Sequence, residues 1–133
     1  MRQLAIELAR SCADDKCDDL IVLDMKTVSG VTDYFVIATG TSDRQIRNAG
    51  DHLIELVRDN GIRPIGVDGY EHAHWILLDF FDIVVHVFSP SYRRLYDLEL
   101  LWGDAPKIRW QRRITKKRKD GQTTEDTKIA EKK

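Results

Sequence analysis

The chain has 133 residues, with 21 Lys and Arg against 22 Asp and Glu, and this length favours a single domain. No segment approaches the roughly 18 apolar residues of a membrane-spanning helix, and the start does not resemble a secretory leader. Cys12 and Cys17 are five residues apart on an expected helix. They should point in different directions, so we expect neither a disulfide framework nor a zinc site. The composition indicates a soluble protein of a reducing compartment, the cytoplasm.

Charge is distributed unevenly along the chain. Residues 1–106 contain 10 Lys and Arg against 18 Asp and Glu, whereas residues 107–133 contain 11 against 4. The apolar periodicity also ends near residue 106, so we expect an acidic α/β domain over 1–106 and a basic, disordered tail over 107–133. Basic side chains around Trp110 would suit RNA phosphates and base stacking. A solvated tail without a ligand explains the same composition.

The first half of the domain predicts two helices that enclose two strands. Residues 1–17 have apolar side chains at helical spacing, and residues 20–23 and 34–39 are apolar runs typical of buried strands. Ser42 and Gln45 have the spacing of a helix-capping box. Apolar residues then recur at helical spacing up to Asn60-Gly61, which predicts the second helix.

The second half predicts a short edge strand, a hairpin and a final helix. The edge strand is expected near residues 65–67, and the hairpin strands over 75–78 and 83–88. A tight connection near Phe80 would place Trp75 opposite His86. Together these elements indicate a single α/β domain with a mixed sheet of about five strands flanked by helices.

The final helix, expected over residues 91–102 with Ser89 or Ser91 as its N-cap, has more apolar surface than a core contact requires. On a helical projection, one apolar face and an extended apolar arc occupy well over half of the cylinder, and only Arg93 and Asp97 mark a polar side. The face contains Leu95, Leu98 and Trp102, and the arc adds Tyr92, Tyr96 and Leu100. Excess apolar surface of this kind predicts a docking site for a partner. Burial of the whole helix within the chain is the alternative.

Candidate catalytic groups are weak. Gly40-Thr41-Ser42-Asp43 follows a strand and precedes a helix, where a phosphate could bind, but it lacks the glycines and lysine of a P-loop. We interpret it as a helix cap. Asp79 and Asp82 bracket a turn and are expected to cap it. A metal site could be built from histidines and one carboxylate, although ordinary polar roles are favoured for these residues: His72, His74, His86 and Asp79. We expect no enzyme activity, no metal and no cofactor.

Four separated blocks resemble the ribosomal silencing factor family, also called the Iojap family. They are DYFVIATGTSDRQIR at residues 33–47, Gly66 ahead of Trp75, DIVVHVF at 82–88 and RRLYDLELLWGDA at 93–105. The resemblance covers about residues 1–105. It implies an α/β fold similar to nucleotidyltransferases but without their catalytic acids.

The resemblance also implies a function. Such proteins bind ribosomal protein fourteen of the large ribosomal subunit and block joining of the small subunit, which represses translation under nutrient limitation. They often form homodimers when free. A nucleotide-binding protein like the nucleotidyltransferases and an RNA-binding protein acting through the basic tail are the alternatives.

Carried onto this sequence, the resemblance implies a partner surface formed or supported by seven residues: Trp75, Asp79, His86, Arg93, Tyr96, Leu98 and Trp102. Thr41, Ser42 and Arg44 match a further family block and are secondary candidates. The chain departs from the family pattern at Phe80-Phe81, which should add an exposed aromatic side chain at the hairpin tip. It departs again after Ala105, so the resemblance does not explain residues 107–133.

Overall fold

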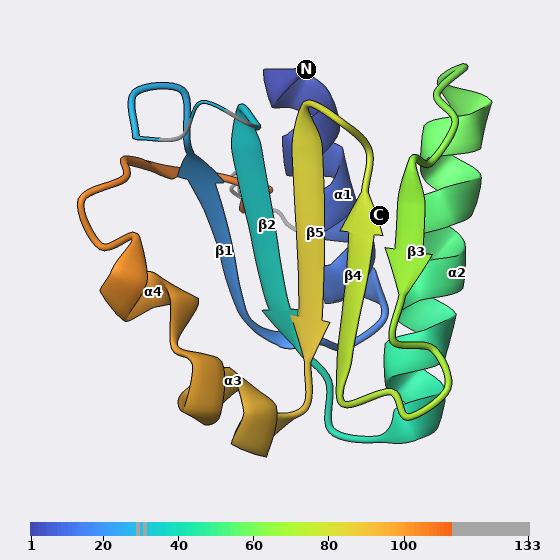
Figure 1. Ribbon diagram of the computed structural model, residues 1–133. Helices are drawn as coiled ribbons and strands as arrows, with labels where there is room; N and C mark the ends of the chain where they lie inside the picture. The colour runs from blue at the N-terminus through green and yellow to red at the C-terminus, as the bar shows by residue number, and fades with distance from the viewer. Residues whose placement is uncertain (29, 31, 113–133) are drawn as a thin grey trace, which may run out of the picture.

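The computed structural model describes residues 1–28, 30 and 32–112. These residues form an α/β domain with one mixed sheet in the order β3-β4-β5-β2-β1-β6 (Figure 1). Strands β2 and β5 are parallel neighbours, and the other pairs are antiparallel. The described sheet has six strands where about five were expected. The elements are α1 (Arg2–Asp14), β1 (Asp18–Asp24), β2 (Tyr34–Thr39), α2 (Asp43–Asp59), β3 (Gly66–Asp68), β4 (Trp75–Asp79), β5 (Ile83–Phe88), α3 (Pro90–Tyr96), α4 (Leu98–Leu101) and β6 (Lys107–Ile108).

The helices cover the two faces of the sheet unequally. Helices α1 and α2 pack on one face, which we call the back face, and α3 and α4 lie on the other, the front face (Figure 1). Because side chains alternate along each strand, each face has its own core. The back core includes Leu8, Leu53 and Val85, whereas the front core includes Ile37 and Phe88.

Helix α2 begins and ends where the sequence predicts. The Ser42 hydroxyl accepts a hydrogen bond from the Gln45 backbone N–H at 3.1 Å. The Gln45 side-chain oxygen accepts one from the Thr41 backbone N–H at 2.6 Å, so it reaches one residue further back than in a standard capping box. Asn60 is the C-cap, and Gly61 follows with φ +76°. The interpretation of the Gly40–Asp43 segment as a helix cap is confirmed.

The expected orientation of the two cysteines was wrong. Helix α1 ends at Asp14, and Lys16 adopts the left-handed φ of 69°. The backbone N–H of Lys16 then bonds to the Ala13 carbonyl, and that of Cys17 to the Cys12 carbonyl, both at 3.0 Å. This pair of bonds is the Schellman motif, which turns the chain back over the helix end. Cys17 therefore faces Cys12.

The register of the β4–β5 hairpin differs by two residues from the expected one. Trp75 pairs with Phe88, and Leu77 pairs with His86. The reason is a longer connection, in which Phe80 is buried, Phe81 is exposed with φ 75°, and the Asp79 carboxylate accepts from the Phe81 N–H at 2.9 Å. The turn-capping role of Asp79 and the exposed aromatic at the tip are thus confirmed.

A shift of two residues keeps each side chain on its predicted face, since the side-chain period of a strand is two. Trp75 and His86 therefore remain on the front face. They lie diagonally, and the Trp75 indole N–H donates to His86 Nδ1 at 3.1 Å.

The single helix expected over residues 91–102 is broken at Asp97. This residue has φ 15° and ψ 65°, which ends α3, and its carboxylate accepts from the Leu100 N–H at 3.2 Å, which caps α4. A helical projection across the break was therefore wrong. Leu95 points to solvent, whereas Leu98 packs against the front core. Ser89 is the N-cap of α3.

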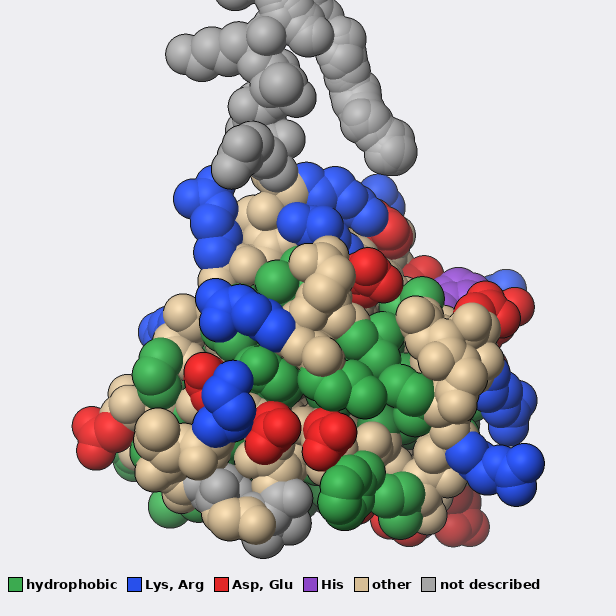
Figure 2. All heavy atoms as spheres, turned by 90° about the horizontal axis from the view of Figure 1, so that it is seen from above, with side chains coloured by type: hydrophobic (Ala, Val, Ile, Leu, Met, Phe, Trp, Pro, Cys, Tyr) green, Lys and Arg blue, Asp and Glu red, His purple; other side chains and the backbone are tan. Residues whose placement is uncertain are grey.

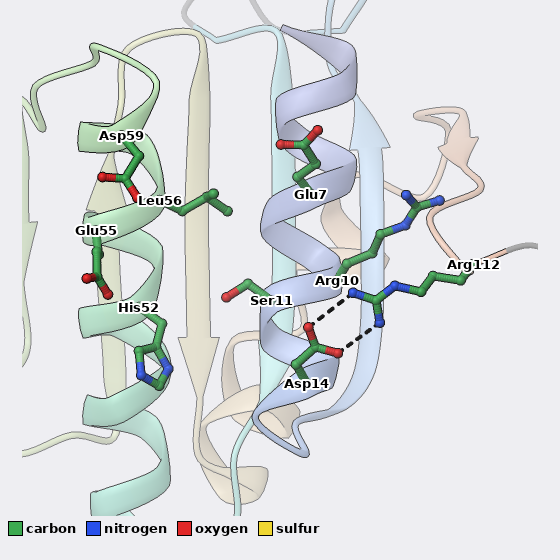
Figure 3. Close-up of a pocket in the computed structure, with 9 residues that line it drawn as sticks. All are labelled: Glu7, Arg10, Ser11, Asp14, His52, Glu55, Leu56, Asp59 and Arg112. Carbon is green, nitrogen blue, oxygen red and sulfur yellow. Dashed lines mark hydrogen bonds and ion pairs between the residues drawn. The ribbon is translucent and has the colours of Figure 1, made fainter. Parts of the chain in front are cut away.

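Residues 107–112, which we assigned to the tail, pack against the domain. Strand β6 pairs with β1, and the Trp110 indole N–H donates to the Leu20 carbonyl at 3.1 Å. Arg10 donates to the Trp110 carbonyl, and Arg112 forms a two-pronged ion pair with Asp14 (Figure 3). The boundary after residue 106 was therefore too early. The expected disorder and RNA binding of residues 113–133 lie outside the described residues.

Trp110 should anchor this last strand. Replacing Trp110 with Ala removes a half-buried ring and its hydrogen bond, and we expect a loss of about 2 kcal/mol in the free energy of unfolding. Denaturant unfolding of the full chain measures the loss. Arg109→Ala, at an exposed neighbouring position, should change stability by no more than about 0.5 kcal/mol. Equal effects of the two substitutions would contradict the anchoring role.

Candidate partner-binding surface

Helices α3 and α4 expose an apolar patch, which we call the α3–α4 patch. It contains Leu95, Tyr96, Leu100 and Leu101, which are 70%, 45%, 81% and 68% exposed. No residue of α3 is buried. A contiguous exposed group of large apolar side chains on a small domain is typical of a protein-binding site. The sequence prediction of surplus apolar area on this segment is therefore confirmed for Tyr96 and Leu100.

Aromatic contacts hold the α3–α4 patch against the front face. The Tyr96 ring lies 4.6 Å from the Trp75 ring, and Tyr92 stacks on His74 at 4.9 Å between ring centroids. Trp102 packs edge-on against Phe35 at 6.2 Å. These ring contacts stabilise the position of α3 and α4 on the front face, because they bury apolar surface in favourable ring geometries. They leave the apolar side chains of the patch uncovered.

The start of α3 is fixed to the end of the parallel strands. The Arg93 guanidinium donates to the Thr39 hydroxyl at 2.8 Å, and the Gly40 backbone N–H donates to the Phe88 carbonyl at 2.8 Å. Arg93, predicted to mark a polar side, is instead half-buried. Its contact with the end of β2 indicates a supporting role beneath the patch.

His86 is the buried centre of the front face. It is 5% exposed, and its ring lies 4.9 Å from Phe35 and 5.9 Å from Phe88. Burial lowers the pKa of His86 to about 4, so the ring is neutral at physiological pH. With Nδ1 accepting from Trp75, the proton lies on Nε2, which has no hydrogen-bond partner among the described residues.

The buried His86 should make stability depend on pH. Because an unperturbed histidine titrates near 6.5, the unfolded chain binds a proton between about pH 4 and pH 6.5 that the folded chain does not. Stability therefore rises with pH across this window. Relative to His86→Gln, which keeps an acceptor for Trp75, we expect the unmodified chain to lose about 3 kcal/mol as pH falls from 7 to 4.

Denaturant unfolding of both proteins at a series of pH values measures this difference. His52 beside Asp15 has a raised pKa, and its opposite contribution is present in both proteins and cancels. Parallel stability curves for the two proteins would show that His86 is solvated in the folded state.

The structure brings most of the predicted partner residues together. Trp75, His86, Leu98 and Trp102 all lie on the front face, His86 beneath the other rings, and Tyr96 caps Trp75. Asp79 lies at the far end of β4, where its carboxylate holds the turn. Thr41, Ser42 and Arg44 are exposed at the start of α2.

The predicted set omitted the three most exposed leucines of the patch, Leu95, Leu100 and Leu101. Leu100 belonged to the apolar arc noted in the sequence. Leu95 was placed on one face with Leu98 and Trp102, because the projection assumed an unbroken helix. The capping residue Asp97 was the available signal for two helices, since Asp is a preferred N-cap.

Polar side chains of the described residues are the other candidates for a site. No group of three or more His, Cys, Asp and Glu side chains among them could hold a metal ion. A cleft of about 470 Å³ lies between α1 and α2 (Figure 3), and three of its side chains form ion pairs: Asp14 with Arg112, and His52 with Asp15. Within the described part of the chain, no helix is long and apolar enough to cross a membrane.

A second group of exposed apolar side chains lies at the end of the molecule viewed in Figure 2, where green side chains gather among charged ones. Met1, Ile65 and Phe81 are exposed at three connections that meet at this end: the start of α1, the residue before β3 and the β4–β5 turn. Unlike the α3–α4 patch, this group does not lie on one continuous segment.

An α/β domain with an uncovered apolar patch of this kind is suited to binding a protein partner. Comparison with known proteins identifies what kind. The family model described as ribosomal silencing factor during starvation matches residues 1–133. The chain is 42% identical over 98 residues to a ribosomal silencing factor of Bacillus subtilis, covering 74% of this chain and 83% of that protein.

Two further comparisons agree. The chloroplast protein Iojap of Arabidopsis thaliana is 36% identical over 104 residues, which cover 78% of this chain and 43% of that protein. A crystal structure of a Chromobacterium violaceum protein superposes with a TM-score of 0.72 at 34% identity, covering 76% of this chain and 85% of the other.

The chain belongs to the ribosomal silencing factor family, whose members repress translation by binding the large ribosomal subunit and are not enzymes. The resemblance noted from the four sequence blocks is thus confirmed. The enzymatic alternative is set aside, in keeping with the commitment of Asp79 to the hairpin turn.

Proposed function

We propose that this protein docks through its α3–α4 patch onto ribosomal protein fourteen of the large ribosomal subunit and sterically blocks joining of the small subunit. It acts in the cytoplasm and lowers translation when nutrients are limiting. The observation that carries the proposal is the exposure of Leu95, Leu100 and Leu101 beside an aromatic front face. Membership of a family that binds the large subunit supports it.

The proposed interface has a centre and a support. Tyr96 and the three leucines are the side chains positioned for direct contact, because they combine large apolar area with exposure. Trp75, Leu98 and Trp102 hold these residues in place and contribute the edge of the surface. His86 and Arg93 act from below, through Trp75 and Thr39 respectively.

Asp79 and the start of α2 form the proposed periphery. The Asp79 carboxylate is half-exposed and is engaged by the turn, so its contribution to partner binding would be polar and secondary. Arg44 is exposed next to the Thr41–Ser42 cap and could contact an acidic group of the partner. Rim charges of this kind mainly affect association rates and orientation.

The mechanism requires only binding and bulk. A protein of 133 residues bound on the joining face of the large subunit would occupy volume that the small subunit needs. A specific interface typically buries about 800 Å² on each partner, an area that one aromatic and several aliphatic anchors can centre. No chemical step is involved.

Co-sedimentation tests the proposal. The purified full chain should sediment with isolated large subunits, and its addition before small subunits should reduce the peak of joined ribosomes. Site-specific cross-linking from position 100 should then capture ribosomal protein fourteen. Binding without any reduction in joined ribosomes would contradict the steric mechanism, and cross-links only to other ribosomal proteins would contradict the proposed contact.

A second copy of the chain is the competing occupant of the same patch. Pairing of free protein through this surface would cover the leucines until the subunit displaces the partner copy. Size-exclusion chromatography of the unmodified chain and of Leu100→Asp shows whether free protein pairs through this patch. A dimer that persists in Leu100→Asp uses another surface.

A further inference from the structure

Cys12 and Cys17 form a buried thiol pair at the end of α1. The Schellman turn at Lys16 places Cys17 over the last turn of the helix, with its N–H bonded to the Cys12 carbonyl at 3.0 Å. In this motif the two side chains that the turn brings together normally make an apolar contact. Here both of these side chains are thiols, and both are buried in the back core.

The two thiols are not equivalent. Cys12 is fully buried, whereas Cys17 is 7% exposed and lies nearer the surface. The neighbouring Cys12 thiol lowers the pKa of Cys17, against the opposing effects of burial and of the Asp15 and Asp18 carboxylates. The neighbouring Cys17 thiol and burial raise the pKa of Cys12. Cys17 is therefore the better nucleophile of the pair.

We propose that Cys12 and Cys17 are a reversible dithiol–disulfide site that exchanges with small-molecule disulfides of the glutathione type. The Cys17 thiolate attacks one sulfur of the small-molecule disulfide and forms a mixed disulfide with it. The other half of the reagent leaves as a thiolate and takes up the proton that Cys17 has lost. The Cys12 thiol then attacks the Cys17 sulfur, and its proton passes to the small thiolate that leaves. The protein disulfide forms, the second small thiol is released, and two electrons have passed from the protein to the reagent.

The position of the pair gives oxidation a structural consequence. Asp15, which lies between the cysteines in sequence, joins α1 to α2: its carbonyl accepts from the Gln45 side chain at 3.0 Å, and its carboxylate bonds to His52 at 2.7 Å. A disulfide would lock this junction on the back face. Because the α3–α4 patch lies on the opposite face, the proposal is independent of ribosome docking (Figure 1). In reducing compartments such disulfides are transient and often act as sensors.

The sequence offers a direct assay, because Lys16 lies between the cysteines. The native full chain is incubated with oxidised glutathione, remaining thiols are alkylated, and the product is digested with trypsin. Cleavage after Lys16 separates residues 11–16 from residues 17–26. We expect the two peptides to remain joined, with the loss of two hydrogen atoms, and to separate on reduction. Two alkylated cysteines at excess oxidised glutathione, or disulfides between chains, would overturn the proposal.

Variants test the order of attack. Cys12→Ala should stop at a glutathione adduct on Cys17, while Cys17→Ala should leave Cys12 unreactive in the folded protein, with circular dichroism confirming the fold. The time course of the unmodified chain gives the same information without substitution, since the early adduct should be on Cys17. An early adduct on Cys12 would overturn the assignment, and reaction only in denaturant would show that the thiols are inert core residues.

Discussion

Replacing Leu100 with Asp should lower the affinity for the large ribosomal subunit at least about 30-fold, equivalent to about 2 kcal/mol. Leu100 is 81% exposed in the α3–α4 patch, and a carboxylate there would lose its hydration on docking without gaining a partner. The free energy of unfolding should change by no more than about 0.5 kcal/mol, because the side chain makes little contact within the monomer. Sedimentation with large subunits and denaturant unfolding measure the two quantities.

A matched control uses the other exposed apolar group. Ile65→Asp places the same charge at a side chain that is 62% exposed on a different connection. It should leave subunit binding unchanged. If Ile65→Asp weakens binding and Leu100→Asp does not, the docking surface lies at the end of the molecule shown in Figure 2.

Tyr96 and Trp102 separate contact from support within the same surface. Tyr96 is half in solvent, so Tyr96→Ala should weaken subunit binding with a small loss of stability. Trp102 packs into the front core against Phe35, so Trp102→Ala should reduce both the affinity for the subunit and the free energy of unfolding. Measurement of both quantities on each variant distinguishes the roles.

The largest loss of stability is expected for Gly69→Ala, about 3 kcal/mol or more. Gly69 has φ +93°, and a Cβ there would overlap the backbone carbonyl oxygen of Trp75. Since both atoms belong to or adjoin the backbone, no side-chain rotation relieves the overlap. The β3–β4 connection would have to move, and with it Trp75, the residue on which Tyr96 rests.

Gly61→Ala isolates the conformational part of this effect, so the difference between the two variants gives the steric part. Gly61 also has a positive φ, +76°, but no heavy atom outside its neighbours lies within 4 Å of the added Cβ. Only the conformational cost of about 1–2 kcal/mol should appear. Denaturant unfolding compares the two variants directly, and equal losses would mean that the loop around Gly69 accommodates a methyl group freely.

Elements with strong local patterns were predictable. Strands β2 and β5 coincide with largely apolar runs rich in β-branched and aromatic residues. Helix α2 has its cap, its apolar period and its stop within 20 residues, counting from Ser42 to Gly61. Such signals depend on neighbours in sequence, so no knowledge of the tertiary contacts is needed. The front-face positions of Trp75 and His86 were also predictable, since they follow from strand alternation.

Features that depend on contacts between residues far apart in sequence were not predictable. Strand β6 has only two residues, and its pairing with β1 joins segments about 85 positions apart. Its local sequence is basic and suggests a tail. The exposed patch was predicted in part: Leu100 was expected from the apolar surplus, but Leu95 was placed on one face with Leu98 and Trp102. The backbone conformation of Asp97 separates these residues.

The sequence by itself determined the class of fold, the family and the presence of surplus apolar surface on residues 91–102, because period, composition and motif are properties of consecutive residues. Only the tertiary structure decided which leucines remain exposed, how far the domain extends past residue 106 and that Cys12 meets Cys17. These three features depend on the direction that the chain takes after a turn. A backbone rotation at one residue, such as Lys16 or Asp97, changes the contacts of the residues that follow it.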